Sequence, residues 1–348
     1  MKRYFAACLL GAVSLGAVAV PAPKSDWHVL HRWQIGGEGG WDYLAFDPAA
    51  KHLYVSRSDR VLVLDVAGMP SMSRSSVIGQ VDGLSGVHGI AIADDLHRGF
   101  ISNGRANTVT VFDPATLKTE RTVAVDGQNP DAILYDPYSK RVFTFNGHSH
   151  DASVIDAASG QLLGTIALPG KPEFAVSDGK GHVYDNIEDK GELVEIDPKA
   201  MKVTHTWPLK NCEDPSGLAI DIAHRRLFSV CQNKNMAVTD ADSGNPVASV
   251  PIGEGPDAAA FDPQRQLAFS SNGESGTLTV VHEDSADHYT VLANVPTQKS
   301  ARTMALDPDG DIYLSAAQFG ARPKPSADNP HGRPPLVPGS FTILVVGQ

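Results

Sequence analysis

The chain has 348 residues and a formal net charge of −11, and it contains 32 glycines and 24 prolines. This abundance of turn-forming residues favours a turn-rich all-β protein over a helical one. The acidic balance argues against a broad nucleic-acid-binding surface, because binding to phosphates needs clustered Lys and Arg.

The N-terminal residues have the pattern of a secretory signal peptide. Two basic residues open the chain, an apolar stretch follows from residue 4 to residue 15, and a small-x-small cleavage site ends at Ala19. An uncleaved membrane anchor is the alternative, but the apolar stretch is short and no other run could span a bilayer. We therefore expect residues 1–19 to be removed and the mature protein to be periplasmic or secreted, with no membrane span.

A sequence pattern then recurs about every 40 to 45 residues, which is the period of a four-stranded propeller blade. Its marker is a turn that ends a short apolar run, as in LAFDP at Asp47 and AFDP at Asp262. The corresponding positions are residues 47, 94, 136, 177, 221, 262 and 307. The steps between them are 47, 42, 41, 44, 41 and 45 residues, so the copies number seven.

Each copy predicts four short strands that are rich in β-branched and aromatic residues. The last copy has no fourth strand, but the segment HVLHRWQIGG at residues 28–37 reads like one and precedes the first copy. We therefore predict an all-β, seven-bladed β-propeller with four antiparallel strands per blade, in which the N-terminal strand closes the last blade. Residues 20–348 would form this single domain, without an open edge between first and last blades.

The second strands of the copies carry the most recognisable signature: Tyr54-Val55-Ser56-Arg57, Phe100-Ile101-Ser102-Asn103 and Phe269-Ser270-Ser271-Asn272. In these residues the copies resemble YVTN-type β-propeller repeats, and nearly all of the mature chain resembles the YncE family of exported proteins. The resemblance implies the fold but not an activity, because such propellers include binding proteins, electron-transfer partners and enzymes. It also suggests single-stranded DNA binding, which the net charge and the shortage of exposed aromatic residues disfavour.

In a propeller the first strand of each blade lines the central channel, and the loops that enter these strands ring one mouth of it. The residues expected at the strand entries differ from copy to copy: Asp42, His88, Asp131, Glu173, Ser216, Asp257 and Arg302. Carboxylates that face one narrow channel repel each other unless a positive group lies among them. Arg302 or a bound divalent metal ion would supply that charge.

We sort the candidate site residues of this face into three groups. His88 and Arg302 are the candidate catalytic residues. The candidate ligand-binding residues are Trp41, Asp42, Arg105, Asp257 and Glu274. The candidate metal ligands, a mixed N/O set for zinc or another transition metal, are Asp131, His148, His150 and Glu173. The loops between second and third strands offer further polar groups, Arg57 among them. A plain alternative stays open, since polar residues at blade entries also satisfy turn backbones and channel waters.

Two cysteines remain after signal-peptide removal, and an oxidising compartment favours their pairing. Cys212 lies just before one predicted strand, and Cys231 ends the next. Antiparallel neighbours bring these positions to the same edge of a sheet, within disulfide reach. The sequence therefore predicts a Cys212–Cys231 disulfide.

The last copy contains a proline-rich insertion at residues 319–340, where the other copies have a short loop. Proline makes the segment stiff and unable to join a sheet. Its place in the repeat puts it beside the channel mouth, and it is locally basic through Arg322, Lys324, His331 and Arg333. We expect a lid or a partner-docking arm, and a solvated, tolerated insertion is the alternative.

Two functions remain in competition. The first is an exported, monomeric propeller that binds a small molecule or a protein partner at the loop face of its channel. The second is a metal-assisted lyase or lactonase, in which a divalent ion at the channel mouth polarises a carbonyl group. In that case Glu173, Asp131 and His148 would be ligands, and His88 would be the base.

Overall fold

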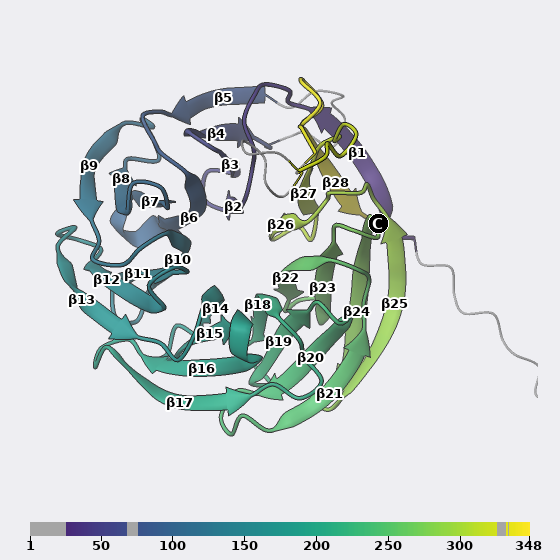
Figure 1. Ribbon diagram of the computed structural model, residues 1–348. Coiled ribbons are helices and arrows are strands. Elements are labelled where there is room, and N and C mark those ends of the chain that lie inside the picture. Colours follow the sequence, from purple (N-terminus) through teal and green to yellow (C-terminus); the bar gives the residue numbers. More distant parts are fainter. Residues whose placement is uncertain (1–25, 68–75, 326–331, 333) are drawn as a thin grey trace, which may run out of the picture.

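The computed structural model describes residues 26–67, 76–325, 332 and 334–348. These residues form seven sheets of four strands each, arranged in a ring around a central axis (Figure 1). The all-β seven-bladed propeller predicted from the repeat is therefore confirmed. The predicted signal peptide lies outside the described residues.

The strands follow the chain order expected of a propeller, from the channel outwards in each blade. Blade one contains β2 (Leu44–Asp47), β3 (His52–Arg57), β4 (Arg60–Asp65) and β5 (Ser76–Val81). Blade two contains β6 (Val87–Ala93), β7 (Arg98–Asn103), β8 (Thr108–Phe112) and β9 (Thr119–Ala124). Blade three contains β10 (Pro130–Asp136), β11 (Arg141–Asn146), β12 (Asp151–Asp156) and β13 (Leu162–Ala167). Blade four contains β14 (Pro172–Ser177), β15 (Val183–Ile187), β16 (Glu192–Asp197) and β17 (Lys202–Pro208).

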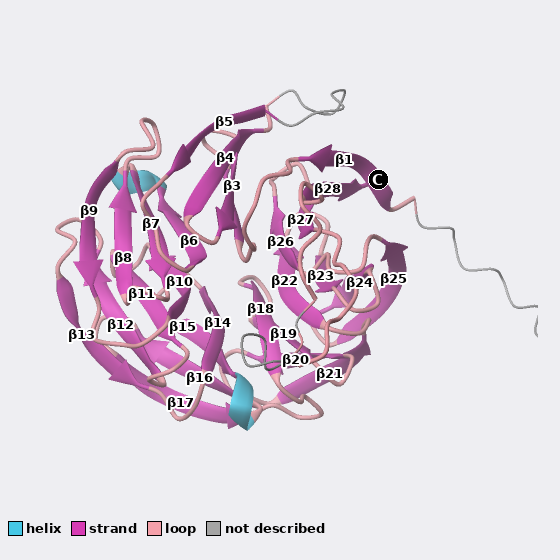
Figure 2. Ribbon diagram, turned by 45° about the horizontal axis from the view of Figure 1, so that its top comes forward, coloured by secondary structure: helices cyan, strands magenta, loops and turns pink. Residues whose placement is uncertain are grey.

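The remaining blades complete the ring. Blade five contains β18 (Pro215–Asp221), β19 (Arg226–Cys231), β20 (Asn235–Asp240) and β21 (Pro246–Pro251). Blade six contains β22 (Pro256–Asp262), β23 (Leu267–Asn272), β24 (Thr277–Ser285) and β25 (His288–Pro296). Blade seven contains β26 (Thr303–Leu306), β27 (Ile312–Ala316), β28 (Thr342–Gly347) and β1 (His28–Gln34). Figure 2 shows two short helical turns, η2 (Asp94–Leu96) and η3 (Glu188–Lys190), between strands.

The ends of the described chain meet in blade seven, as the sequence predicted. Strand β1 pairs antiparallel with β28 and forms the outer edge of that blade (Figure 1). Trp33 of β1 is only 1% exposed and lies 5.8 Å from the ring of Tyr313 in β27. The N-terminal strand thus closes the ring and buries a large apolar side chain while doing so.

The repeated turn has a simple physical cause. The carboxylate of Asp47 accepts hydrogen bonds from the backbone N–H groups of Ala49 and Ala50. Asp262 makes the same pair of bonds in blade six, to Gln264 and Arg265. An Asp side chain that binds backbone N–H groups two and three residues ahead stabilises a tight turn, so the repeat is visible as a spacing of Asp residues.

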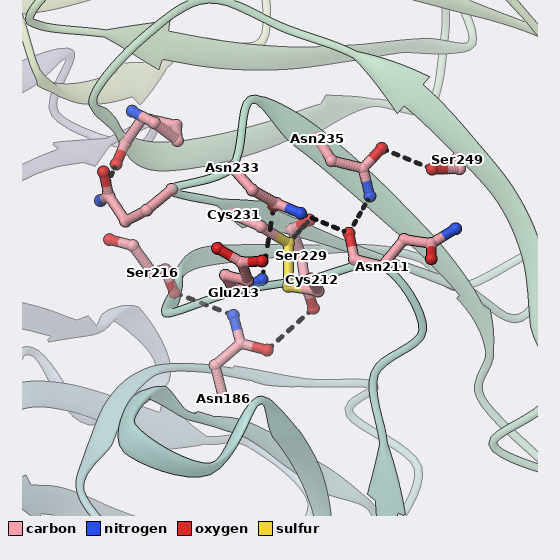
Figure 3. Close-up of a disulfide and its surroundings, with 12 residues drawn as sticks. Asn186, Asn211, Cys212, Glu213, Ser216, Ser229, Cys231, Asn233, Asn235 and Ser249 are labelled. Atoms are coloured by element: carbon pink, nitrogen blue, oxygen red, sulfur yellow. Dashed lines mark hydrogen bonds between the residues drawn. A yellow bond between two sulfur atoms is a disulfide. The ribbon is translucent and has the colours of Figure 1, made fainter.

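The predicted disulfide between Cys212 and Cys231 is present, with a Cα–Cα distance of 5.2 Å (Figure 3). It joins the loop that enters blade five to the end of β19. The neighbouring Asn211 carbonyl accepts hydrogen bonds from the amides of Asn233 and Asn235. These bonds hold the entry loop of blade five against the β19–β20 hairpin, directly before the channel-lining Ser216.

No helix among the described residues is long and apolar enough to cross a membrane.

Candidate functional site

One side chain from each blade faces the channel at the entry of its innermost strand. We call this set the entry ring: Asp42, His88, Asp131, Glu173, Ser216, Asp257 and Arg302. In blades two to six a register shift between the first two strands occurs directly at this position. Such a bulge redirects a side chain out of the regular alternation of a strand, which explains why polar residues here face the channel and not a blade interface. The residues expected at the strand entries all line one of three adjoining cavities.

Charges of opposite sign alternate around five consecutive blades of the entry ring. Arg302 Nη1 lies 3.1 Å from Asp257 Oδ2, and Arg302 Nη2 lies 3.8 Å from Asp42 Oδ1. His88 Nδ1 lies 2.7 Å from Asp42 Oδ2 and 3.4 Å from Asp131 Oδ1. An imidazolium at position 88 therefore completes an alternating series in which two cations lie between three carboxylates. The donor atoms of Asp42, His88 and Asp131 also lie within 4.8 Å of one another, close enough to share a metal ion.

Glu173 has a separate cationic partner. Lys171 Nζ lies 3.1 Å from Glu173 Oε2 and also pairs with Glu188. Beneath Glu173, Tyr43 of blade one reaches across the channel, stacks on Phe174 of blade four with 5.5 Å between ring centroids, and donates a hydrogen bond to the Glu173 carbonyl. The two aromatic rings thus form a floor below the polar mouth of the channel.

The entry ring holds acids whose pKa values lie close to neutrality. Burial raises the pKa of Asp131 and of Asp257 to about 6, although His88 and Arg302 respectively act against it. Burial raises the pKa of Glu173 to about 8, against the effect of Lys171. Burial lowers the pKa of His88, but the hydrogen bond to Asp42 and the nearby charge of Asp131 outweigh it, so that pKa is raised. The ring can therefore exchange protons near neutral pH, as acid–base groups in binding and catalytic sites do.

Two larger cavities open above the ring. The first, of about 660 Å³, is lined by polar groups that include His88, Arg105, Asn129 and His148. The second, of about 590 Å³, is lined by Asp257, Glu274, Phe319 and Leu336 among others. Both cavities are also lined by Gly40, Trp41 and Arg302. The two cavities are thus halves of one depression at the channel mouth, and they meet at Trp41 and Arg302.

We predicted from the sequence that the candidate ligand-binding residues lie on one face of the propeller. All of them line this depression. Trp41 and Asp42 line the first cavity together with Arg105, and Asp257 and Glu274 line the second. Arg105 makes no hydrogen bond or ion pair through its side chain in the described part of the chain.

The candidate metal ligands are not brought together as a set of four. Asp131 clusters with Asp42 and His88, and Glu173 pairs with Lys171. His148 lines the first cavity, whereas His150 lies at a turn with a positive φ of 55° and lines none of the three cavities. His148 and His150, two positions apart on this loop, do not line the same cavity, and their spacing in the sequence does not reveal this.

Arg57, which the sequence predicted to be one of the polar groups of the loop face, has a structural role. It is 0% exposed, and its guanidinium donates hydrogen bonds to the carbonyls of Gly36, Glu38, Gly39 and Gly40. Its guanidinium carbon also lies 4.0 Å from the centre of the Phe341 ring. Arg57 therefore organises the loop that presents Trp41 and Asp42 to the cavities.

Sequence reasoning named Trp41 but missed the aromatic residues that pack against it. The ring of Trp41 lies 5.8 Å from Phe319 and 5.5 Å from Phe341. Phe319 opens the proline-rich insertion, is 47% exposed, and forms an isolated β-bridge with Leu336 near the end of the insertion. The described ends of the insertion thus form a wall of the second cavity, while the basic residues His331 and Arg333 lie outside the described residues.

Comparison with known proteins shows the fold and no family. No family model matches the chain, and no curated protein matches it. A chain in the crystal structure of a mitotic checkpoint complex is similar, with a TM-score of 0.73 and 13% identity over 98% of this chain and 99% of that one. Kuenenia stuttgartiensis hydrazine synthase matches with a TM-score of 0.67 and 15% identity over 94% of this chain and 99% of that one. The structure of U3-55K matches with a TM-score of 0.72 and 11% identity over 93% of this chain and 99% of that one. At these identities the likeness establishes a seven-bladed β-propeller, a fold that commonly binds partners, and nothing about the ligand.

Proposed function

We propose that this protein binds a small organic anion with an apolar body in the depression at its channel mouth. The observation that carries the proposal is the division of that depression into a cationic half and an aromatic half that meet at Trp41 and Arg302. Concave sites with an apolar wall and a few convergent polar groups are the usual form of small-molecule sites.

The charge of the first cavity supports an anionic group on the ligand. Its charged lining consists of Arg105, Arg302 and the carboxylate Asp42, together with His88 and His148. Asp42 is already engaged by His88 at 2.7 Å. Arg105 is exposed and has no side-chain partner among the described residues, so its guanidinium is available to a carboxylate or phosphate, which it can bind in a bidentate manner.

The lining of the second cavity supports an apolar body. Trp41, Phe319 and Leu336 contribute apolar surface there, and Phe319 remains about half exposed without a ligand. An aromatic or aliphatic group placed between Trp41 and Phe319 would remove this surface from water, which stabilises a complex by about 25 cal/mol per Å² buried.

Calorimetric titration with 4-phenylbutyrate as a probe tests the proposal, with the neutral 4-phenylbutyramide as the matched ligand. We expect the carboxylate to bind at least tenfold more tightly than the amide, and Arg105→Glu to weaken its binding at least tenfold. The control is Lys118→Glu, the same charge change on an exposed turn at the opposite end of the same blade. No binding of the carboxylate, or equal loss in both variants, would overturn the proposal.

A second candidate, the metal-assisted lyase or lactonase, is favoured by one specific observation. The donor atoms of Asp42, His88 and Asp131 lie within 4.8 Å of one another; Asp42 and His88 line the first cavity, and Asp131 lines the third, adjoining one. A divalent ion held there would polarise a carbonyl group of a bound ligand. Lactone hydrolysis that requires Mn²⁺ or Zn²⁺ and disappears in His88→Ala would support this function. Hydrolysis at the same rate with and without the ion would exclude it.

We also propose that the protein is exported, belongs to the YncE-type propellers and acts as a monomer. The signal-peptide pattern supports export, and so does a disulfide, since disulfides persist mainly in oxidising compartments. The YVTN-like second strands of blades one, two and six support the YncE likeness. N-terminal sequencing of the protein from its native host tests export, with a mature start at Val20 expected. Light scattering tests the monomer, with a mass near 35 kDa expected, roughly that of a chain without its first 19 residues.

A further inference from the structure

We propose a second site, for a zinc-type divalent metal ion, formed by Asp221, His224 and Glu283 on the face opposite the channel mouth. Asp221 ends β18 in blade five, and His224 lies in the turn that follows it. Glu283 comes from β24 in blade six. The site therefore spans two blades and is separate from the entry ring, which lies at the other ends of the innermost strands.

The donor atoms have the spacing of a metal-ligand set. His224 Nδ1 lies 2.7 Å from Asp221 Oδ2 and 3.4 Å from Glu283 Oε1, and the three donor atoms all lie within 4.8 Å of one another. Tetrahedral zinc with bonds of about 2.0–2.2 Å separates its ligand atoms by about 3.3 Å. One imidazole and two carboxylates are a donor set that zinc accepts.

The burial of the two carboxylates favours a cation between them. Glu283 is 3% exposed and Asp221 is 1% exposed, so two acidic side chains face each other away from water. Glu283 Oε2 is buried, and no N–H or O–H donor of a described residue reaches it; it lies beside the Asp221 carboxylate, so a cation or a proton must hold the two acids together. A buried carboxylate oxygen without a donor destabilises the folded protein, and a bound cation would satisfy it.

Glu283 also departs from the repeat at a position that carries an apolar residue in three other blades. Its backbone N–H donates to the carbonyl of Gln266, and Val66, Ala157 and Ala241 make the equivalent bond in blades one, three and five. Those three residues are buried and carry no polar side chain. The turn itself therefore does not require a carboxylate at position 283. Two other blades carry Ala at the equivalent position, so the fold accommodates alanine there.

The surroundings complete the site. The hydroxyl of Tyr289, on the long strand β25, lies 2.7 Å from the Ala286 carbonyl and 3.3 Å from Glu283 Oε1, so these two acceptors share its one proton. Such a partner would orient the carboxylate toward the ion. The His224 side chain is 43% exposed, so the ion would keep one side open to water or to an external ligand.

Zn²⁺ binding to chelator-treated protein, followed by calorimetry and by thermal unfolding, tests the site. We expect one Zn²⁺ equivalent to be lost, or bound at least tenfold more weakly, in Glu283→Ala and in His224→Ala. His28→Ala serves as the control, because it removes an exposed histidine of β1 that belongs to neither cluster and should leave Zn²⁺ binding unchanged. Without Zn²⁺, Glu283→Ala should be at least as stable as wild type, since it removes a buried carboxylate that has an unpaired oxygen.

Two results would overturn the proposal. One is the absence of any Zn²⁺-dependent shift in the wild-type protein. The other is equal Zn²⁺ binding in the wild type, Glu283→Ala and His224→Ala, which would leave a hydrogen-bonded cluster only. If Glu283→Ala folds poorly, Zn²⁺ binding is measured on Glu283→Gln instead, with the same expected loss. The proposal does not depend on anion binding at the channel mouth, so the two can fail independently.

Discussion

Asp185 is a carboxyl group buried in an apolar part of the ring. It is 0% exposed in β15, lies opposite Ala175 and Val194 on the neighbouring strands, and neither oxygen has a hydrogen-bond partner of normal geometry among the described residues. Burial, and then the nearby charge of Glu173, hold its pKa well above the ordinary value. A group whose folded-state pKa is raised adds stability below its unfolded pKa, near pH 4, and that contribution is lost as the pH rises.

We therefore expect Asp185→Asn to stabilise the protein more at pH 8 than at pH 5. The difference arises because only the wild type has this carboxyl group. Above pH 4 its free energy of unfolding falls by up to about 1.4 kcal/mol per pH unit, until the carboxyl ionises in the folded state. Urea unfolding at the two pH values measures it, with the exposed Asp126→Asn as control. The same pH dependence in wild type and Asp185→Asn would contradict this view.

Arg57 is a second single residue with a testable role, because it holds the loop that carries Trp41 to the channel mouth. Replacing it by Met removes a hydrogen-bond donor from four backbone carbonyls of residues 36–40, and we expect a loss of about 3 kcal/mol of unfolding free energy. Binding of 4-phenylbutyrate should weaken as well, because this loop carries Trp41. Arg60→Met is the control, since Arg60 donates to one of those carbonyls and should cost less than about 1 kcal/mol. Equal costs for the two variants, from urea unfolding curves, would count against this role.

At the scale of the element, strand β1 determines whether the ring stays closed. Trp33→Ala removes a fully buried ring from the contact between β1 and blade seven, and we expect it to cost about 3–5 kcal/mol. The partly exposed Trp207 on the outer strand β17 of blade four provides the comparison, and its replacement by Ala should cost less. Thermal unfolding measures both. A smaller effect at Trp33 than at Trp207 would mean that closure contributes little.

The disulfide stabilises a second element, the entry loop of blade five. Its cysteines are 19 residues apart, and a crosslink of that span is worth about 3 kcal/mol. We expect the double replacement Cys212→Ser with Cys231→Ser to lose about that much stability in urea unfolding. Reductant should lower the stability of the wild type and leave the double variant unchanged. A wild type that is indifferent to reductant would show that the crosslink adds nothing.

At the scale of the whole molecule, local rules explain what the sequence could predict. The Asp turns and the alternation of short strands are local signals, so blade number, strand order, closure by β1 and the disulfide were all predictable. The entry ring was predictable too, because every innermost strand begins at the same mouth. Contacts between blades were not, since His88 meets Asp42 and Asp131 only through the angle between blades and the choice of rotamer. The inward turn of Arg57 and the wall formed by Phe319 and Leu336 depend on loop paths that no spacing encodes.

The most direct test of the account is a crystal structure of the protein with bound 4-phenylbutyrate. The account predicts the carboxylate in the first cavity, within hydrogen-bond distance of Arg105 or Arg302, and the phenyl ring in the second cavity against Trp41 and Phe319. Density for the ligand only on the outer strands, or with its ring among the carboxylates of the entry ring, would contradict it.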